Sequence, residues 1–172
     1  MFIQRETPDQ VDAIRAVTAA AFTRPDQGSG PPVEAPLVDE LRASDAWLPA
    51  LSLVAVEDGQ VIGHVVCTRA QIESAPSLGL GPLSVHPDHH GRGVGLALVH
   101  AVLGAADALD EPLVVLLGDP RYYSRFGFRL AAEYGIAPPV PEWAPHFQVR
   151  TLATYTPDLR GKFTYAEPFD RV

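Results

Sequence analysis

Residues 85–95 of this chain read Val85-His86-Pro87-Asp88-His89-His90-Gly91-Arg92-Gly93-Val94-Gly95. They join an apolar, strand-like segment to the segment 94–109, in which almost every position is apolar. Glycines at alternate positions leave backbone N–H groups unobstructed by Cβ atoms, and the positive end of the following helix dipole lies at the same place. Such a turn is an anion cradle suited to phosphate, although a glycine-rich turn without any ligand has the same composition.

Two common phosphate-binding motifs do not fit this turn. A P-loop needs Gly-Lys-Ser/Thr, and the turn contains no lysine. The dinucleotide fingerprint Gly-x-Gly-x-x-Gly would need a glycine at Leu96 or at Leu98. A nicotinamide-binding fold is therefore disfavoured.

The segments before the turn predict two helices. Thr7-Pro8-Asp9-Gln10 has the composition of a capping box, and apolar residues at helical spacing follow it to Phe22. A shorter amphipathic segment lies around residues 37–42, after the Pro/Gly-rich loop 23–32. We expect both helices to place one apolar face on the sheet.

The remaining segments before the turn predict strands. Residues 51–56 and 61–68 are apolar and β-branched, and Asp58-Gly59 between them is typical of a hairpin. Ala75–Val85 is a third run that contains Gly81-Pro82. Because proline removes a donor from a strand ladder, we expect this strand to be detached locally from one neighbour.

The segments after the turn predict further strands and one short helix. Their pattern indicates, in chain order, a buried strand, a short helix that begins at Asp119 and ends at Gly127, one further strand, a Pro-rich loop and a terminal hairpin. The corresponding residues are 113–117, 119–127, 128–134, 137–146, and 147–155 paired with 161–166. With no interdomain linker, the sequence predicts one domain over 1–172, with a core of about 1–134 and an additional loop and hairpin at 135–172.

Composition excludes several classes of function. Thirteen basic against twenty-one acidic side chains give a net charge of −8, so no basic face for nucleic acid is expected. No apolar run is long enough to span a membrane, and the single cysteine, Cys67, excludes an internal disulfide or a cysteine-rich zinc site. A cytoplasmic location is the simplest expectation.

Two motifs resemble the GCN5-related N-acetyltransferases. The hexapeptide 90–95, His90-Gly91-Arg92-Gly93-Val94-Gly95, resembles their acetyl-CoA pyrophosphate loop, Gln/Arg-x-x-Gly-x-Gly/Ala, with His90 departing at the first position. The block 122–128, Tyr122-Tyr123-Ser124-Arg125-Phe126-Gly127-Phe128, resembles the Tyr-x-x-x-Gly-Phe element of the same family. The longer string 118–128 is similar to a predicted, mostly uncharacterised subgroup.

The resemblance implies an α/β (α+β) fold and acetyl-CoA as co-substrate. The implied sheet is mixed, mostly antiparallel and splayed between its fourth and fifth strands, with about four flanking helices. The implied cofactor-binding residues are those of the strand end and the glycine turn: Leu83, Ser84, Val85, His90, Gly91, Arg92, Gly93, Val94 and Gly95. The backbone of the first three would bond the pantetheine arm as an added strand does.

The implied activity is transfer of an acetyl group to a primary amine by direct attack in a ternary complex. In the family a tyrosine protonates the departing thiolate, and Tyr123 stands at that place, while Tyr122 is expected to pack or to line the cleft. The pattern favours neither a metal site nor an acetyl-cysteine intermediate. A metal held by His86, His89 and His90 lacks a fixed further ligand, so no metal is expected, and Cys67 has the pattern of a buried hydrophobe.

The acceptor is a small-molecule or peptide amine that the sequence does not identify. It should lie between the loops 23–36 and 136–146. Glu34 in the first loop and Glu73 on the third strand are candidate substrate-binding carboxylates. The sequence pattern does not distinguish either carboxylate from a solvated surface charge. A chain of water molecules could act as the general base in place of a carboxylate. Other functions left open are a CoA-binding sensor or partner module without transfer activity and a transferase of longer acyl groups. No nucleic-acid or membrane partner is expected, and a homodimer is one option for the assembly.

Overall fold

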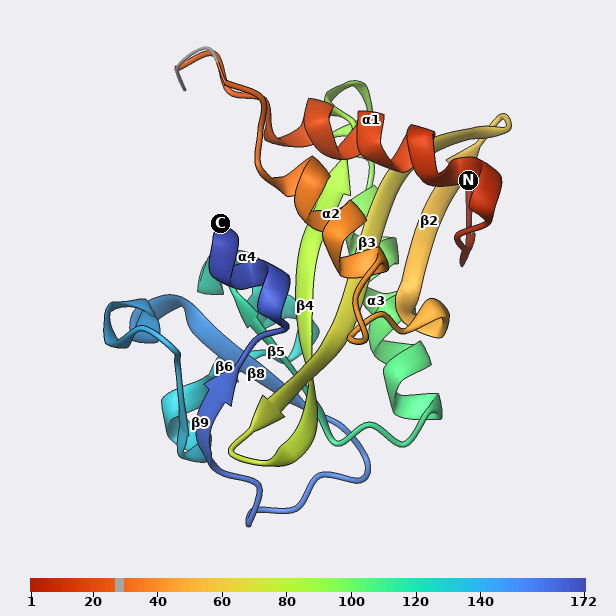
Figure 1. The fold of residues 1–172 in the computed structure, drawn as a ribbon. Helices are drawn as coiled ribbons and strands as arrows, with labels where there is room; N and C mark the ends of the chain where they lie inside the picture. Colours follow the sequence, from red (N-terminus) through yellow and green to blue (C-terminus); the bar gives the residue numbers. More distant parts are fainter. Residues whose placement is uncertain (27–29) are drawn as a thin grey trace.

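A computed structural model describes residues 1–26 and 30–172 of the chain. In this part of the chain a sheet runs in the order β1-β2-β3-β4-β5-β8-β6, while β9 pairs with β3 and with β7 (Figure 1). The strands are β1 (Phe2–Arg5), β2 (Ser52–Glu57), β3 (Gln60–Ile72), β4 (Ala75–Val85), β5 (Leu113–Leu117), β6 (Arg129–Leu130), β7 (Ile136–Ala137), β8 (Phe147–Thr151) and β9 (Gly161–Thr164). Within the path from β1 to β6, pairing is antiparallel except between β4 and β5, so the predicted mixed sheet is confirmed.

The helices cover both faces of this sheet. The α-helices are α1 (Val11–Phe22), α2 (Glu34–Arg42), α3 (Val94–Ala108) and α4 (Pro120–Tyr123). Short 3₁₀ turns complete the chain: η1 (Pro8–Gln10), η2 (Pro49–Leu51), η3 (Pro87–His89), η4 (Ser124–Phe126), η5 (Ala131–Tyr134), η6 (Pro141–His146) and η7 (Glu167–Arg171). Figure 1 shows α1 and α2 together on one side of β2, β3 and β4, with α3 behind these strands. In the described residues, no helix is both long and apolar enough to cross a membrane.

Local sequence signals account for the first half of the fold. The Thr7 capping box is present, with the Thr7 N–H donating to Gln10 Oε1 at 3.0 Å, and it leads through η1 into α1. Asp58 and Gly59 both have positive φ, which a tight β-hairpin turn requires, and they join β2 to β3 as predicted. The apolar α3 buries Leu98, Val102 and their neighbours against the sheet in the largest core cluster.

The ladder defect in β4 is confirmed, and it separates β4 from β5. The register between β3 and β4 shifts between Val65 and Cys67, opposite Leu83 and Leu80, so Gly81-Pro82 falls outside the regular pairing. Beyond that point β4 keeps β3 as its neighbour. By contrast, β5 pairs with β4 only at Leu78–Val114 and Gly79–Val115. The fourth and fifth strands therefore diverge after Gly79.

The predicted terminal hairpin is wrong, because β8 and β9 do not pair with each other. All five residues of β5 pair with β8, which lies on the edge of β5 opposite to β4. β9 pairs with the far end of β3 and with β7. Phe147 on β8 and Phe163 on β9 are both fully buried, with ring centroids 5.5 Å apart. The segment after residue 134 is thus part of the central sheet. The strand expected over 128–134 is reduced to β6 followed by η5.

Candidate active site

The glycine turn forms an open concave surface between β4 and α3. Gly91 and Gly93 have φ of +71° and +79°, a left-handed conformation that favours glycine, and a Cβ built at either position would meet no atom within 4 Å. That open space is what an approaching phosphate needs, and α3 begins at Val94, directly after the turn. The residues present therefore fit a CoA pyrophosphate.

A cavity of about 520 Å³ lies at this turn. Its lining comes from the end of α1, the end of β4, the turn itself and the α4–η4 segment: Ala21, Phe22, Arg24, Leu83, Val85, His89, His90, Gly91, Gly93, Val94, Gly95, Leu96, Tyr122 and Arg125. Most of the residues predicted to bind the cofactor are brought together here.

His90, which departs from the family pattern, has a structural contact. Its Nε2 lies 2.9 Å from the backbone oxygen of Val85, so the side chain ties the turn to the end of β4. The imidazole in this position leaves the backbone groups of the following glycines accessible. Replacing the usual side chain by histidine therefore does not close the cradle.

Arg92 is one of two predicted cofactor-binding residues, with Ser84, that are absent from the lining of this cavity. Its Nη2 lies 3.0 Å from Glu57 Oε2, and its Nη1 lies 2.8 Å from His89 Nδ1. Arg92 is absent from the described lining, so only its backbone remains a candidate contact. The physical reason is the nearby carboxylate on β2, which the sequence places 35 residues away.

Two arginines that the sequence reasoning missed lie in the lining instead. Arg125 places its guanidinium carbon 4.6 Å from the centroid of the Tyr122 ring, and Arg24 follows the end of α1. Residues three apart share one face of a helical turn, so the spacing of Tyr122 and Arg125 was a usable signal. No comparable local signal pointed to Arg24.

A second, larger cavity of about 880 Å³ adjoins the first. Phe22 and Leu83 belong to both linings, so the two cavities meet along β4. Leu80, Gly81 and Pro82 also line the larger one, as do Leu116 and Leu117 of β5. The cavity therefore lies where β4 and β5 diverge.

The backbone of Leu83, Ser84 and Val85 borders this gap. These residues pair with Val65, His64 and Gly63 of β3. Their other edge has no partner in β5, whose pairing with β4 ends at Gly79. The Ser84 hydroxyl donates to Thr18 Oγ1 at 3.2 Å and is directed to α1, so the groups open to a ligand are those of the backbone.

The two adjacent tyrosines face different cavities. Tyr123 lines the larger cavity, and its ring packs against Tyr122, Phe126 and Phe128 at centroid distances of 4.9, 6.2 and 5.8 Å. Burial raises the pKa of Tyr123 to about 12, so its hydroxyl stays protonated at neutral pH. Tyr122 lines the glycine-turn cavity, as expected for a residue that packs or lines the cleft.

The two candidate acceptor carboxylates have different locations. Glu34, at the start of α2, lines the larger cavity. Glu73 does not: it is exposed in the β3–β4 turn, and its Oε1 accepts a hydrogen bond of 2.8 Å from the backbone N–H of Lys162. The expectation that Glu73 faces the acceptor cleft is therefore corrected, because its carboxylate anchors β9 instead.

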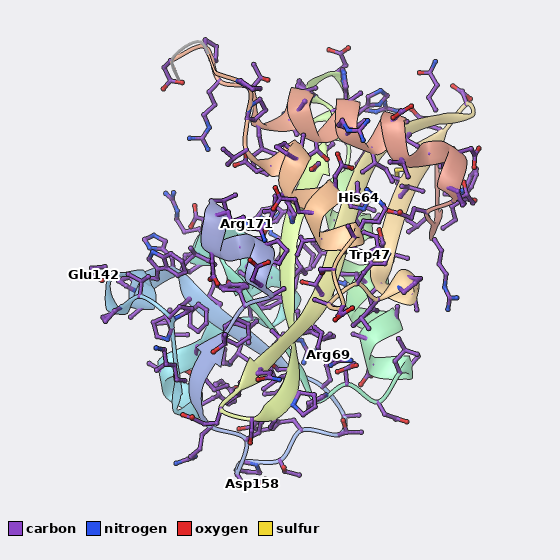
Figure 2. The ribbon with its side chains drawn as sticks, viewed as in Figure 1. Trp47, His64, Arg69, Glu142, Asp158 and Arg171 are labelled. Atoms are coloured by element: carbon purple, nitrogen blue, oxygen red, sulfur yellow. The ribbon has the colours of Figure 1, made fainter. Side chains whose placement is uncertain are left out.

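The walls of the larger cavity come from several parts of the chain. Trp143 of η6 lies in the lining, whereas its neighbour Glu142 is exposed at the outer edge of the molecule (Figure 2). Residues 27–29 of the predicted acceptor loop 23–36 lie outside the described residues. Tyr165, Phe169 and Asp170 complete the wall and were missed, because nothing in the local pattern places the end of the chain beside α2.

Comparison with known proteins identifies the class. A family model described as an acetyltransferase (GNAT) domain matches residues 49–130, which contain the glycine turn and Tyr123 but not the walls formed by Glu34, Trp143 and Tyr165. The chain belongs to the GNAT acetyltransferase family, as a relative 35% identical over its full length also shows.

The individual relatives extend over nearly the whole chain. That relative is the uncharacterised N-acetyltransferase YhbS of Escherichia coli strain K12, with 99% of each chain covered; YjhQ of the same strain is 32% identical over 93% of this chain and 90% of its own. A crystal structure of E. coli YhbS in complex with CoA superposes with a TM-score of 0.88 at 33% identity, covering 99% of this chain and 92% of that one. The crystal structure of a Brucella melitensis GNAT acetyltransferase in complex with acetyl-CoA gives a TM-score of 0.80 at 37% identity, covering 98% of this chain and 97% of that one.

Proposed function

We propose that this acetyltransferase uses acetyl-CoA to acetylate a primary amine by direct attack in a ternary complex. The observation that carries the proposal is the adjoining pair of cavities: a glycine turn open to phosphate in one, and a protonated tyrosine in the other, with Leu83 common to both. The CoA and acetyl-CoA complexes of the two structural relatives support the choice of co-substrate.

Each part of the co-substrate has a candidate partner in the chain. The backbone N–H groups from Gly91 to Gly95, at the N-terminus of α3, would hold the pyrophosphate, and Arg125 and Arg24 would add positive charge beside it. The free edge of Leu83, Ser84 and Val85 would bond the pantetheine amides. This arrangement directs the thioester end from the first cavity into the second.

The chemistry requires one proton donor and one route for proton loss. When bound, acetyl-CoA supplies a thioester whose C–S bond breaks as the amine nitrogen forms a C–N bond to the carbonyl carbon. Tyr123 donates a proton to the departing sulfur, and backbone N–H groups stabilise negative charge on the carbonyl oxygen. The proton lost by the amine leaves to solvent, from which Tyr123 is reprotonated.

Burial of the departing thiolate would offset the high pKa of Tyr123. A thiol in water has a pKa near 8.5. In water, a thiolate would therefore be too weak a base to take a proton readily from a tyrosine hydroxyl. Burial raises the pKa of a thiol as well as of a phenol, as it does for Cys67 in this protein. A thiolate formed beside Tyr123 is therefore a stronger base than in water.

Cys67 itself offers no support for an acetyl-enzyme route. It is fully buried in the core cluster beneath α3, and the raised pKa of its thiol keeps it protonated at neutral pH. Attack by the amine in a ternary complex needs no such nucleophile. Glu34 and Asp170 are the carboxylates in the described lining that could accept the amine proton, alongside water.

A turnover assay tests the proposal. Purified protein with acetyl-CoA and a panel of primary amines should release free CoA thiol in proportion to an N-acetylated product identified by mass spectrometry. CoA binding by calorimetry with no product from any amine would contradict the proposal and would favour a CoA-binding module. Replacing acetyl-CoA by longer acyl-CoA thioesters in the same assay tests the acyl group, and acetyl-CoA should give the highest kcat/KM.

A further inference from the structure

The larger cavity has an aromatic wall built by the last part of the chain. Phe163, Tyr165 and Phe169 lie in contact along β9 and η7, with ring centroids 4.7 Å apart for the first pair and 4.8 Å for the second. Trp143 of η6 lines the same cavity. This wall meets the β4–β5 gap at Gly79, where a Cβ would lie 3.1 Å from the Tyr165 ring. The aromatic surface therefore continues to the place where β4 and β5 diverge.

Phe169 of the aromatic wall packs against an apolar cluster that contains Leu37 and Leu41 of α2, and charged contacts lie outside the cavity. Arg171 pairs with Glu40 of α2 at 2.8 Å and with Glu167 at 2.6 Å, and Figure 2 shows Arg171 on the final turn of the chain. Figure 1 shows that turn folded back beside α2. Such exposed pairs contribute little stability each, so the apolar packing of Phe169 is the main contact that positions η7.

The charged groups of the cavity are few and of mixed sign. Among the side chains of the described lining residues, the charged groups are two carboxylates, Glu34 and Asp170, and one ammonium group, that of Lys162. Apart from the tyrosines and Thr164, the other lining side chains are apolar, or absent at Gly81, and they include Trp143, Phe163 and Phe169.

This balance of charge and apolar surface discriminates between classes of acceptor. A polyamine would bring several positive charges against an excess of one carboxylate, and its other ammonium groups would be desolvated without partners. A phosphorylated or carboxylated amine would need cations, and Lys162 is the single one in the described lining. One ammonium group on an apolar body matches both the carboxylates and the rings, since aromatic faces also attract cations.

We infer that the acceptor is a small monoamine with an aromatic or similarly apolar body, held between Trp143, Tyr165 and Phe169 and attracted by Glu34 and Asp170. This inference rests on the proposed amine acetylation and specifies its substrate. A volume of about 880 Å³ accommodates such a molecule together with the thioester end of the co-substrate, since ligand pockets usually span about 300–1,000 Å³. The ring would lie in the aromatic wall, with the nitrogen directed toward Tyr123 and the β4–β5 gap.

Equilibrium binding separates this inference from the proposed activity. Phenethylamine, ethanolamine and spermidine are titrated by calorimetry into the CoA-loaded protein, and the same amines, with a lysine-containing peptide, are assayed for acetylation. Phenethylamine should bind at least about tenfold more tightly than ethanolamine or spermidine, because a ring that fills an apolar pocket adds at least as much discrimination as one methylene. It should also have the highest kcat/KM of the panel.

Matched variants test whether the amine binds in the larger cavity. Trp143→Ala should weaken phenethylamine binding at least about fivefold while CoA affinity stays unchanged, because Trp143 lines only the larger cavity. Phe2→Ala, which removes an exposed aromatic ring from β1, should change neither. Glu34→Gln should weaken binding of all three amines and reduce the dependence of that binding on salt.

Each result has a defined meaning. Phenethylamine binding that Trp143→Ala abolishes, without any acetylated product, would support the inferred pocket and contradict the proposed function. Preferential binding or acetylation of spermidine, ethanolamine or the peptide would overturn the inference and leave the acetyltransferase function standing. Absence of amine binding to a CoA-loaded protein would also overturn it.

Discussion

The ring of Tyr123 lies against the α-carbon of Gly118. A Cβ at position 118 would be 2.5 Å from Cε2 of Tyr123 and 2.9 Å from its Cδ2, closer than side-chain atoms approach. Gly118 cannot easily move away, because its N–H donates to the backbone oxygen of His146 and its oxygen accepts from Gln148 Nε2, both at 2.9 Å. The glycine that directly follows β5 thus limits the position of the proposed proton donor.

Gly118→Ala is expected to displace Tyr123 while leaving the glycine turn unaltered. The proton donor would then be misplaced, so kcat should fall at least about tenfold, since small misplacements of catalytic groups have costs of this size or larger. CoA affinity measured by calorimetry should stay within about twofold. Gly104→Ala is the control, because a Cβ at that helical position meets no atom within 4 Å; unchanged kcat in the Gly118 variant would show that Tyr123 tolerates the shift.

Tyr123→Phe is expected to lower kcat by about 10²–10⁴-fold, the usual contribution of a positioned acid. The ring and its packing on Gly118 remain, so the melting temperature and the CoA affinity should be nearly unchanged. Tyr122→Phe is the matched control, because its hydroxyl belongs to the other cavity. Near-wild-type kcat with chemistry shown to be rate-limiting would remove Tyr123 from the mechanism and assign the proton to water.

Gly93→Val is expected to weaken acetyl-CoA binding about tenfold or more. Gly93 has φ of +79°, which a β-branched residue adopts only with strain, and its side chain would project into the open cradle. Calorimetry on variant protein with a cooperative melting transition measures the effect. A folded variant with wild-type CoA affinity would place the pyrophosphate elsewhere.

Arg125→Ala is expected to weaken CoA binding more than Arg92→Ala does. Arg125 lines the glycine-turn cavity, whereas the Arg92 side chain is paired with Glu57 outside it. The loss at Arg125 should be several-fold at low salt and smaller at high salt, because the charge is exposed and therefore screened. Titrations at two ionic strengths measure both variants; equal losses would mean that Arg92 leaves Glu57 to reach the phosphates.

The free energy of unfolding is expected to decrease as the pH falls below neutrality, because of a network around Glu6. Burial raises the pKa of Glu6, but hydrogen bonding with His64, Arg42 and Ser52 outweighs it, and the pKa falls from 4.5 to about 2. The Glu6 carboxylate lies 2.8 Å from Arg42 Nε and 2.5 Å from the Ser52 hydroxyl, which itself lies 2.8 Å from His64 Nε2. A carboxylate with a depressed pKa contributes stability above pH 4.5 that is lost as the pH falls toward 2.

His64 acts in the same direction at higher pH. Burial lowers the pKa of this fully buried imidazole below 6.5. The unfolded chain therefore takes up a proton at pH values where the folded protein does not, and stability decreases as the pH falls below 6.5.

Denaturant unfolding at several pH values measures both effects. Glu6→Gln should lower the free energy of unfolding at pH 7 by about 1–3 kcal/mol and should flatten its decrease below pH 4.5. Glu142→Gln, at an exposed position, is the control. An unchanged acid dependence in the Glu6 variant would mean that other carboxylates dominate it.

The features that the sequence determined are those encoded within a few adjacent residues. The Asp58-Gly59 hairpin, the Thr7 capping box and the ladder defect at Gly81-Pro82 each follow from backbone preferences of the residues present, and all three appear as predicted. The glycine turn and the Tyr123 block are also encoded locally, because each consists of residues at a fixed spacing along one loop or one helical turn. The family could therefore be identified from them.

Tertiary structure decided what depends on distant partners. β8 pairs with β5, on the edge opposite to β4, rather than with β9, and no residue near 147 signals a partner that lies about 30 residues earlier in the chain. The orientation of Arg92 depends on a carboxylate 35 residues away, and that of Glu73 on Lys162, 89 residues away. The aromatic wall at Tyr165 and Phe169 exists only because the end of the chain packs beside α2, and such long-range packing leaves no local pattern.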